Sequence, residues 1–119
     1  MKTTLSLCIF LFLGLGPTLA QMGTHNVDGS GSLMLDNEKV EVIKYVGTPQ
    51  GDVCGVGQHH HQAHLTVALT DATVLLVENG KEQLAEIPAG AALWFGAGTH
   101  AVINRGQADT EFLLIYLKD

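Results

Sequence analysis

The sequence predicts an all-β protein, built as a small β-barrel or jelly roll of about eight strands. Two observations favour this fold class. Beyond residue 20 the chain shows no helical periodicity, and its β-branched and apolar residues form short runs separated by Gly, Pro, Asn and Asp. The runs recur at intervals of about ten residues, which is typical of short strands joined by tight turns.

Residues 1–20 predict an export signal that is not part of the fold. Lys2 precedes an apolar run over residues 5–15, and Ala20 ends a small-residue cleavage site. The run of about 11 residues is shorter than the roughly 20 that cross a bilayer. We therefore expect cleavage after Ala20 and a mature protein that is periplasmic or secreted and free of the membrane.

The 99 residues that follow are enough for one domain with a single core. Residues 21–31 lack a strand pattern, so we expect a flexible arm there. Residues 32–119 are expected to form the β-barrel domain. Its strands are expected at 32–35, 39–46, 59–69, 73–77, 82–87, 91–95, 100–104 and 110–117.

Turn residues support these boundaries. Residues 78–81 contain Asn-Gly, which favours a two-residue hairpin turn because both central residues must take a positive φ. Residues 36–37, 88–90 and 105–109 are expected to close three further connections. The longest irregular stretch, residues 47–58, is rich in glycine and precedes the most informative part of the chain.

The charge of the chain argues against two classes of partner. The whole chain carries a formal net charge of −6, and the mature chain without Lys2 carries −7. A domain this acidic has no basic surface for nucleic acid and little attraction to an anionic membrane. We therefore expect neither nucleic acid nor a membrane as a partner.

The two cysteines, Cys8 and Cys54, cannot form a disulfide within the mature chain, because Cys8 leaves with the signal. The remaining thiol of Cys54 therefore needs another explanation. Three roles stay open for it: packing as a small apolar side chain, a link to another molecule, or ligation of a metal ion.

Four of the six histidines lie in residues 59–64, His-His-His-Gln-Ala-His. Because side chains alternate along a strand, His59 and His61 point to one face and His60 to the other, where we expect it exposed or hydrogen-bonded. Two imidazoles on one face can hold one transition metal ion. A bend at residues 62–63 would turn His64 toward the same centre. The alternative is a solvated polar edge of the sheet.

A site with two histidines needs further ligands from elsewhere in the chain. His100 is the only other histidine inside an expected strand, and the glycines before it let the backbone pass close to a site. No carboxylate is a convincing catalytic base, because the acidic residues between 71 and 86 lie at turns or on exposed strand faces. Trp94 is expected to pack in the wall or core of the barrel, with a place in a ligand pocket as the alternative.

These residues resemble the motifs of the cupins, in particular small single-domain bacterial members of the conserved-barrel type. The first cupin motif contains His-x-His, followed three or four residues later by Glu, and the second ends in His-x-x-x-Asn. The resemblance covers roughly residues 40–118. It is carried by His59 and His61 in the first motif and by Gly90, Gly98, His100 and Asn104 in the second.

The chain departs from the cupin pattern at the metal site. Leu65 and Thr66 stand where the motif has its Glu, and Gly96 stands in place of a Pro. The resemblance implies a metal centre whose carboxylate position is unfilled. With a histidine in that position, the centre would have only imidazole ligands and would keep the full charge of a divalent ion. The expected ligands are His59, His61, His100 and, in place of the Glu, His64.

The sequence thus predicts an exported, metal-binding cupin that holds a divalent transition metal ion (Fe, Mn, Zn, Ni or Cu) and takes a small molecule as its ligand, or as the substrate of an unknown reaction. The alternative is a non-catalytic cupin module that captures a small ligand or a metal, which the missing Glu favours. Whether the chain is an enzyme stays open, because a fold does not determine a function. The strand at 110–117 is apolar on both faces and cupins are commonly dimers, so we also expect a homodimer.

Overall fold

The computed structural model describes residues 26–27 and 31–119, so the expected signal peptide and His25 lie outside the described residues. No helix capable of spanning a membrane is found in this described part of the chain. Its residues form the strands β1 (Asn26–Val27), β2 (Gly31–Asp36), β3 (Val40–Gly47), β4 (His59–His61), β5 (His64–Ala68), β6 (Ala72–Glu78), β7 (Lys81–Ile87), β8 (Ala92–Phe95), β9 (Gly98–Asn104) and β10 (Thr110–Leu117).

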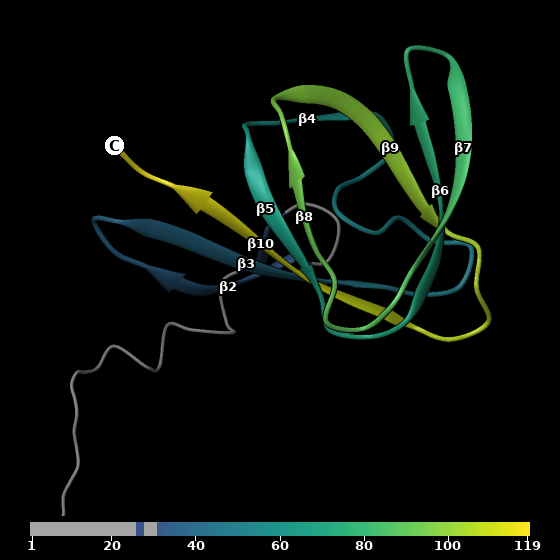
Figure 1. The fold of residues 1–119 in the computed structure, drawn as a ribbon, viewed down its shortest axis with the longest axis horizontal. Helices are drawn as coiled ribbons and strands as arrows, with labels where there is room; N and C mark the ends of the chain where they lie inside the picture. Colours follow the sequence, from purple (N-terminus) through teal and green to yellow (C-terminus); the bar gives the residue numbers. More distant parts are fainter. Residues whose placement is uncertain (1–25, 28–30) are drawn as a thin grey trace, which may run out of the picture.

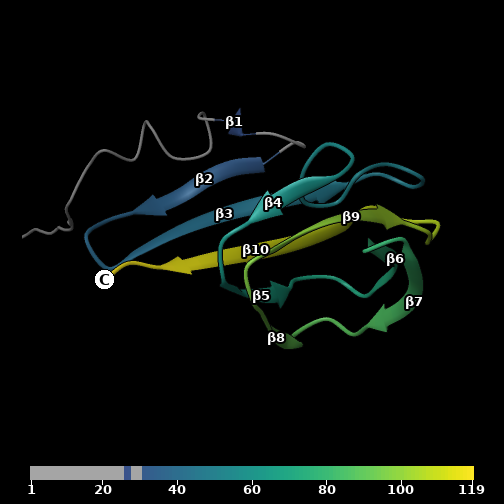
Figure 2. The ribbon, with the colours of Figure 1, turned by 90° about the horizontal axis from the view of Figure 1, so that it is seen from above.

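The strands form two antiparallel sheets in a jelly-roll arrangement (Figure 1). The larger sheet has the order β1-β2-β3-β10-β5-β8, and the smaller has the order β4-β9-β6-β7. Figure 2 shows the larger sheet as a curved layer in which β10 lies between β3 and β5, with β9, β6 and β7 beside it. The all-β class predicted from the sequence is confirmed.

Each sheet buries one face, because apolar side chains occupy alternate positions of the strands. In the larger sheet, Ile43 of β3 lies opposite Leu114 of β10, and both are buried. In the smaller sheet, Val74 of β6 and Val102 of β9 are buried. These side chains belong to one hydrophobic core cluster, and the site described below is built at its edge.

The segment expected as one strand at 59–69 is two strands. β4 pairs with β9 in the smaller sheet, whereas β5 pairs with β8 and β10 in the larger sheet. The exposed residues Gln62 and Ala63 form the bend between them, as the sequence predicted. A single strand was wrong because the chain changes sheets at this bend. His61 and His64 therefore come from different sheets.

The predicted hairpin turn at residues 78–81 is confirmed. Asn79 and Gly80 have φ values of 54° and 75°, so both central residues are in the left-handed region, as a type I′ turn requires. At the turn between β2 and β3, the side-chain oxygen of Asn37 accepts hydrogen bonds from the backbone N–H groups of Lys39 and Val40. Both turns are held by the residue types that the sequence singled out.

The arm expected at residues 21–31 includes residues that pair with the sheet. Within its described part, Asn26 and Val27 form β1 and lie opposite Ser32 and Gly31 of β2. The sequence shows no strand pattern there because an edge ladder is made by backbone N–H and C=O groups and needs no alternation of apolar side chains.

The expectation that Trp94 packs in the wall or core of the barrel is wrong. It lies on β8, the edge strand of the larger sheet, and its side chain is 60% exposed. Its inward-facing neighbours Leu93 and Phe95 take the wall positions, because side chains alternate along the strand. The sequence could not assign the two faces of this short strand, since both carry large apolar residues.

Candidate metal centre

Four side chains from three separate segments converge at the end of the smaller sheet. His59 and His61 lie on β4, and His100 lies opposite His59 on the neighbouring strand β9. Cys54 comes from the irregular segment before β4. One ligand atom from each of the four residues lies within 4.8 Å of the ligand atoms of the others. We call these four residues the His/Cys cluster.

The alternation of side chains along β4 gives the cluster its shape. His59 and His61 share one face, with ring centroids 4.5 Å apart, and the ring of His100 lies 4.9 Å from His59 and 5.1 Å from His61. His60 points the other way, is exposed, and has its Nδ1 3.3 Å from the hydroxyl of Thr99. The expected position of His60 is therefore confirmed.

Hydrogen bonds outside the cluster orient two of its rings. The Nδ1 of His59 donates to the carbonyl oxygen of Gly57 at 2.8 Å, which leaves its Nε2 facing the Sγ of Cys54 at 3.5 Å. The Nδ1 of His61 lies 2.7 Å from the hydroxyl of Tyr116. Partners of this kind commonly fix the tautomer and the direction of metal-ligating imidazoles.

The Nε2 of His61 is buried and lacks a hydrogen-bond partner. Among the described residues it is the one buried side-chain nitrogen or oxygen atom with no hydrogen-bond partner. Buried polar atoms are normally paired, because an unpaired one costs free energy of desolvation. A metal ion at the centre of the cluster would bind the lone pair of this nitrogen, so the residues present fit such an ion.

Burial keeps two imidazoles of the cluster, those of His61 and His100, neutral. The pKa of His61 is lowered to about 4 by burial and by the neighbouring His59, His100 and His64, and the pKa of His100 is lowered to about 4 by burial, His59 and His64. At neutral pH these rings therefore keep the lone pairs that metal ligation needs.

The thiol of Cys54 adds a donor that an all-imidazole centre lacks. Burial, together with the carboxylate of Asp52, raises its pKa to about 12, so the thiol is protonated at neutral pH when no metal is bound. A metal ion would displace that proton, because a coordinating thiol is deprotonated. A divalent ion in this cluster would then carry a net charge of +1 instead of the full charge expected from four imidazoles.

His64 lies beside the cluster but is not one of its four residues. It begins β5 in the other sheet, is 2% exposed, and donates from Nδ1 to the carbonyl oxygen of Gln62 at 2.7 Å. Its ring centroid lies 5.1 Å from that of His61, and it stacks on Phe95 at 5.7 Å. The structure thus brings together three of the four expected ligands and adds Cys54 to them.

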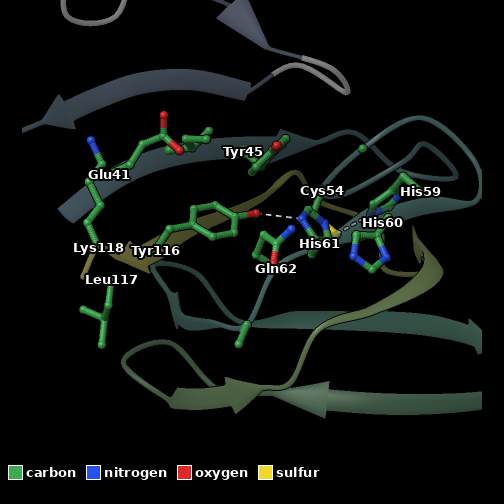
Figure 3. Close-up of a pocket in the computed structure, with 13 residues that line it drawn as sticks. Glu41, Tyr45, Cys54, His59, His60, His61, Gln62, Tyr116, Leu117 and Lys118 are labelled. Atoms are coloured by element: carbon green, nitrogen blue, oxygen red, sulfur yellow. Dashed lines mark hydrogen bonds between the residues drawn. The ribbon is translucent and has the colours of Figure 1, made fainter.

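A groove gives access to the cluster from solvent. Its volume is about 600 Å³, and its lining runs from Cys54, His59 and His61 past Tyr116 to Glu41. Figure 3 shows the ring of Tyr116 in the middle of this groove, with its hydroxyl directed at His61. The size of the groove is that of a site for a small molecule.

Cys54 and Tyr116 were not among the candidate site residues from the sequence. A signal for Cys54 exists, since it is an unpaired cysteine five residues before the first histidine of the cluster, and ligation was one of its three open roles. Tyr116 gives no comparable signal, because its contact with His61 joins residues 55 positions apart in the chain.

The fold is similar to that of solved structures named as cupins and to that of a polyketide cyclase. A cupin domain from Bordetella pertussis Tohama I matches with a TM-score of 0.69 and 24% identity, over 82% of this chain and 100% of that chain. A polyketide cyclase from Streptomyces resistomycificus matches with a TM-score of 0.64 and 13% identity, over 90% and 81%. An RmlC-like cupin family protein with a double-stranded β-helix fold from Methanocaldococcus jannaschii matches with a TM-score of 0.59 and 11% identity, over 74% and 78%.

No family model and no curated protein matches the sequence. The likeness is thus one of architecture, and it agrees with the motifs that the sequence shares with cupins. The chain has the cupin fold.

Proposed function

We propose that this chain with the cupin fold is an exported metal-binding protein, in which the His/Cys cluster holds one divalent transition metal ion. The observation that carries the proposal is the convergence of four ligand atoms within 4.8 Å of one another. The unpaired Nε2 of His61 supports it, because an ion would supply the missing partner.

The donor set narrows the range of ions. A thiolate is a soft ligand, and three imidazoles with one thiolate match the tetrahedral sites that Zn²⁺ prefers. Mn²⁺ prefers oxygen ligands, and no carboxylate belongs to the cluster. Of the ions expected from the sequence, we therefore propose Zn²⁺ first and copper second.

The groove supports a small molecule as the further partner of the site. When bound, the ion would supply Lewis-acid chemistry to a molecule in the groove, provided that one coordination position stays open. Three histidines would leave such a position, whereas ligation by Cys54 would close a four-coordinate site. The second candidate function, a non-catalytic module that captures metal, is therefore favoured by the presence of Cys54 in the cluster.

Metal analysis of the untagged mature protein, purified without chelator, tests the proposal. We expect close to one ion per chain, and its loss in His61→Ala. His60→Ala is the matched control, because His60 is the neighbour that points away from the cluster, and this variant should keep the ion. A wild-type protein that carries no metal and binds none on titration with Zn²⁺ or Cu²⁺ would contradict the proposal.

Export is supported by the sequence pattern of residues 1–20 alone. The mass of the intact protein recovered from a bacterial periplasm or culture medium tests this part of the proposal. We expect a mature chain that begins at Gln21. Recovery of the full-length chain from the cytoplasm would contradict it.

We further propose a homodimer, formed by the outer face of the larger sheet. A row of paired apolar side chains crosses this face from β2 to β8. The residues at its two ends are 39% and 60% exposed. Apolar rows of this kind are typical of contacts between subunits. The row consists of Leu35, Val42, Ile115, Leu65 and Trp94.

A further inference from the structure

Tyr116 links the larger sheet to the His/Cys cluster. It lies on β10 of the larger sheet, and its hydroxyl lies 2.7 Å from the Nδ1 of His61 on β4 of the smaller sheet (Figure 3). The ring of Tyr116 is half-buried, and its centroid lies 5.2 Å from that of His64. Packing of the ring therefore holds the hydroxyl at one ring nitrogen of His61.

The direction of this hydrogen bond decides which nitrogen of His61 carries the proton. A neutral imidazole has one N–H, and a tyrosine hydroxyl can either donate or accept. If Tyr116 donates, the proton of His61 lies on Nε2, where a buried N–H would have no acceptor and no lone pair would face an ion. If Nδ1–H of His61 donates, Nε2 keeps its lone pair, and the O–H of Tyr116 is free to point into the groove.

The second arrangement leaves no buried donor of this pair without an acceptor. Buried N–H groups without a partner are rare in proteins, because each costs free energy of desolvation. The hydroxyl of Tyr116 keeps its own proton at neutral pH, since burial, together with Tyr45 and Cys54, raises its pKa above the ordinary value. It is therefore a neutral acceptor for the Nδ1–H of His61.

His59 already has this arrangement, with a partner that allows only one direction. Its Nδ1 must donate to the carbonyl oxygen of Gly57, because a carbonyl oxygen only accepts. The Nε2 of the neutral ring then has a lone pair on the side of Cys54. The same tautomer of His61 would give the cluster two imidazoles of β4 that are both ready to bind an ion through Nε2.

We propose that Tyr116 is a positioning residue of the metal centre, whose hydroxyl oxygen accepts from the Nδ1–H of His61 and so keeps the Nε2 lone pair of His61 directed into the cluster. Its purpose rests on the proposed metal function, but the tautomer that it sets is present in the metal-free protein. Tyr116 acts through His61 and does not itself bind the ion.

NMR of the metal-free protein with ¹⁵N-labelled histidine tests the tautomer directly. Long-range ¹H–¹⁵N correlation spectra at mildly alkaline pH, where histidine is neutral, show which ring nitrogen carries the proton. We expect the proton of His61 on Nδ1 in the wild type. In Tyr116→Phe no oxygen accepts from Nδ1–H, so a large share of His61 should carry its proton on Nε2.

His59 is the internal control in the same spectra, because its partner Gly57 is unchanged in the variant and its proton should stay on Nδ1. Phenylalanine keeps the aromatic ring, so a role of Tyr116 in packing alone would leave the tautomer of His61 as it is. A wild type with the His61 proton on Nε2, or a tautomer that is unchanged in Tyr116→Phe, would overturn the proposal.

The affinity for Zn²⁺ tests the consequence for the metal centre. We expect Tyr116→Phe to bind Zn²⁺ about tenfold or more weakly in competition with a chelator, the usual effect of removing the partner of a metal-ligating histidine. Thr99→Val is the matched control. It also removes a hydroxyl that lies beside the Nδ1 of a β4 histidine, but that histidine is His60, which points away from the cluster.

This control should keep the wild-type affinity. An unchanged affinity in Tyr116→Phe, or an equal loss in Thr99→Val, would overturn the positioning role and leave the metal proposal standing. A wild type that binds no ion would instead overturn the metal proposal, and the spectra of the metal-free protein would still decide whether Tyr116 sets the tautomer of His61.

Discussion

Cys54 sets the proton balance of the candidate metal centre. Its pKa is raised to about 12, whereas the pKa values of His61 and His100 are lowered to about 4. At mildly alkaline pH, up to about pH 9, the thiol is therefore the group that must lose a proton when an ion binds. We expect one proton released per ion, and an affinity for Zn²⁺ that rises about tenfold for each pH unit, as calorimetry in buffers of different ionisation enthalpy would measure.

Cys54→Ser supplies the control for this proton release. Serine keeps a polar atom at the same place but does not ionise in this range, so proton release should fall to near zero while three imidazoles still bind the ion. Substitution with Co²⁺ gives an independent readout, because a thiolate ligand produces a charge-transfer band that Cys54→Ser should abolish. Proton release that is unchanged in the variant would show that Cys54 is not a ligand.

The two buried imidazoles predict an acid-sensitive apo-protein. In the unfolded chain His61 and His100 would return to the ordinary histidine pKa of about 6.5, above their folded value of about 4. The unfolded state then binds more protons between these pH values, so the free energy of unfolding falls as pH falls from about 6.5 toward 4.

Urea unfolding of the metal-free protein at about pH 7 and pH 5 measures this effect. The wild type should be less stable at pH 5, and His100→Gln should show a smaller difference because it lacks one of the two groups. Equal stability of the wild type at both pH values would contradict the buried, neutral state of these rings.

At the scale of the elements, the segment before β4 positions the ring of His59. Gly55 has a φ of 151°, and a Cβ added there would lie 2.7 Å from Cγ of His59. Gly55→Ala should therefore push the His59 ring out of the cluster and weaken Zn²⁺ binding by roughly tenfold or more. Competition with a colorimetric chelator would measure the change.

Gly57→Ala is the matched control for Gly55→Ala. Gly57 also has a positive φ, of 55°, but a Cβ there would meet no atom within 4 Å. This variant carries the backbone strain, keeps the carbonyl oxygen that accepts from the His59 ring, and adds a Cβ that does not touch that ring, so its affinity for Zn²⁺ should fall less. Equal losses in the two variants would attribute the effect to loop strain and not to the position of the ring.

The elements also show what the sequence could predict and why. Alternation along each strand places His59 and His61 on one face and His60 on the other, because this pattern is local. At residues 62–63 the sequence predicted a bend, but it did not predict that the chain changes sheets there. Cys54 was not identified as a member of the cluster, because no strand pattern fixes the direction of side chains in the irregular residues before β4.

The sequence could not predict which distant strands pair, because the pattern within each strand is local. The neighbours β3, β10 and β5 come from three separate parts of the chain, and the contact of Tyr116 with His61 depends on that order. Likewise, Trp94 could be assigned to a face only after β8 was known to be an edge strand with Leu93 inside.

At the scale of the whole molecule, the inner and outer faces of the sheets carry different features. Their inner faces enclose the core, and one end carries the His/Cys cluster and the groove, whereas the outer face of the larger sheet carries the apolar row. Register pairs Leu65 with both Trp94 and Ile115, so the row is continuous across the sheet. In the isolated chain this row leaves apolar surface in contact with water, which a second copy would cover.

Trp94→Glu tests the proposed homodimer. Trp94 ends the row and is 60% exposed in the isolated chain, so a charge there costs the monomer little but would be buried without a partner in the dimer. We expect the wild type to sediment as a dimer and this variant as a monomer. Leu84→Glu is the control, because Leu84 is equally exposed but lies on β7 of the other sheet. A wild type that sediments as a monomer, or a Trp94→Glu variant that stays a dimer, would show that this row is not a subunit contact.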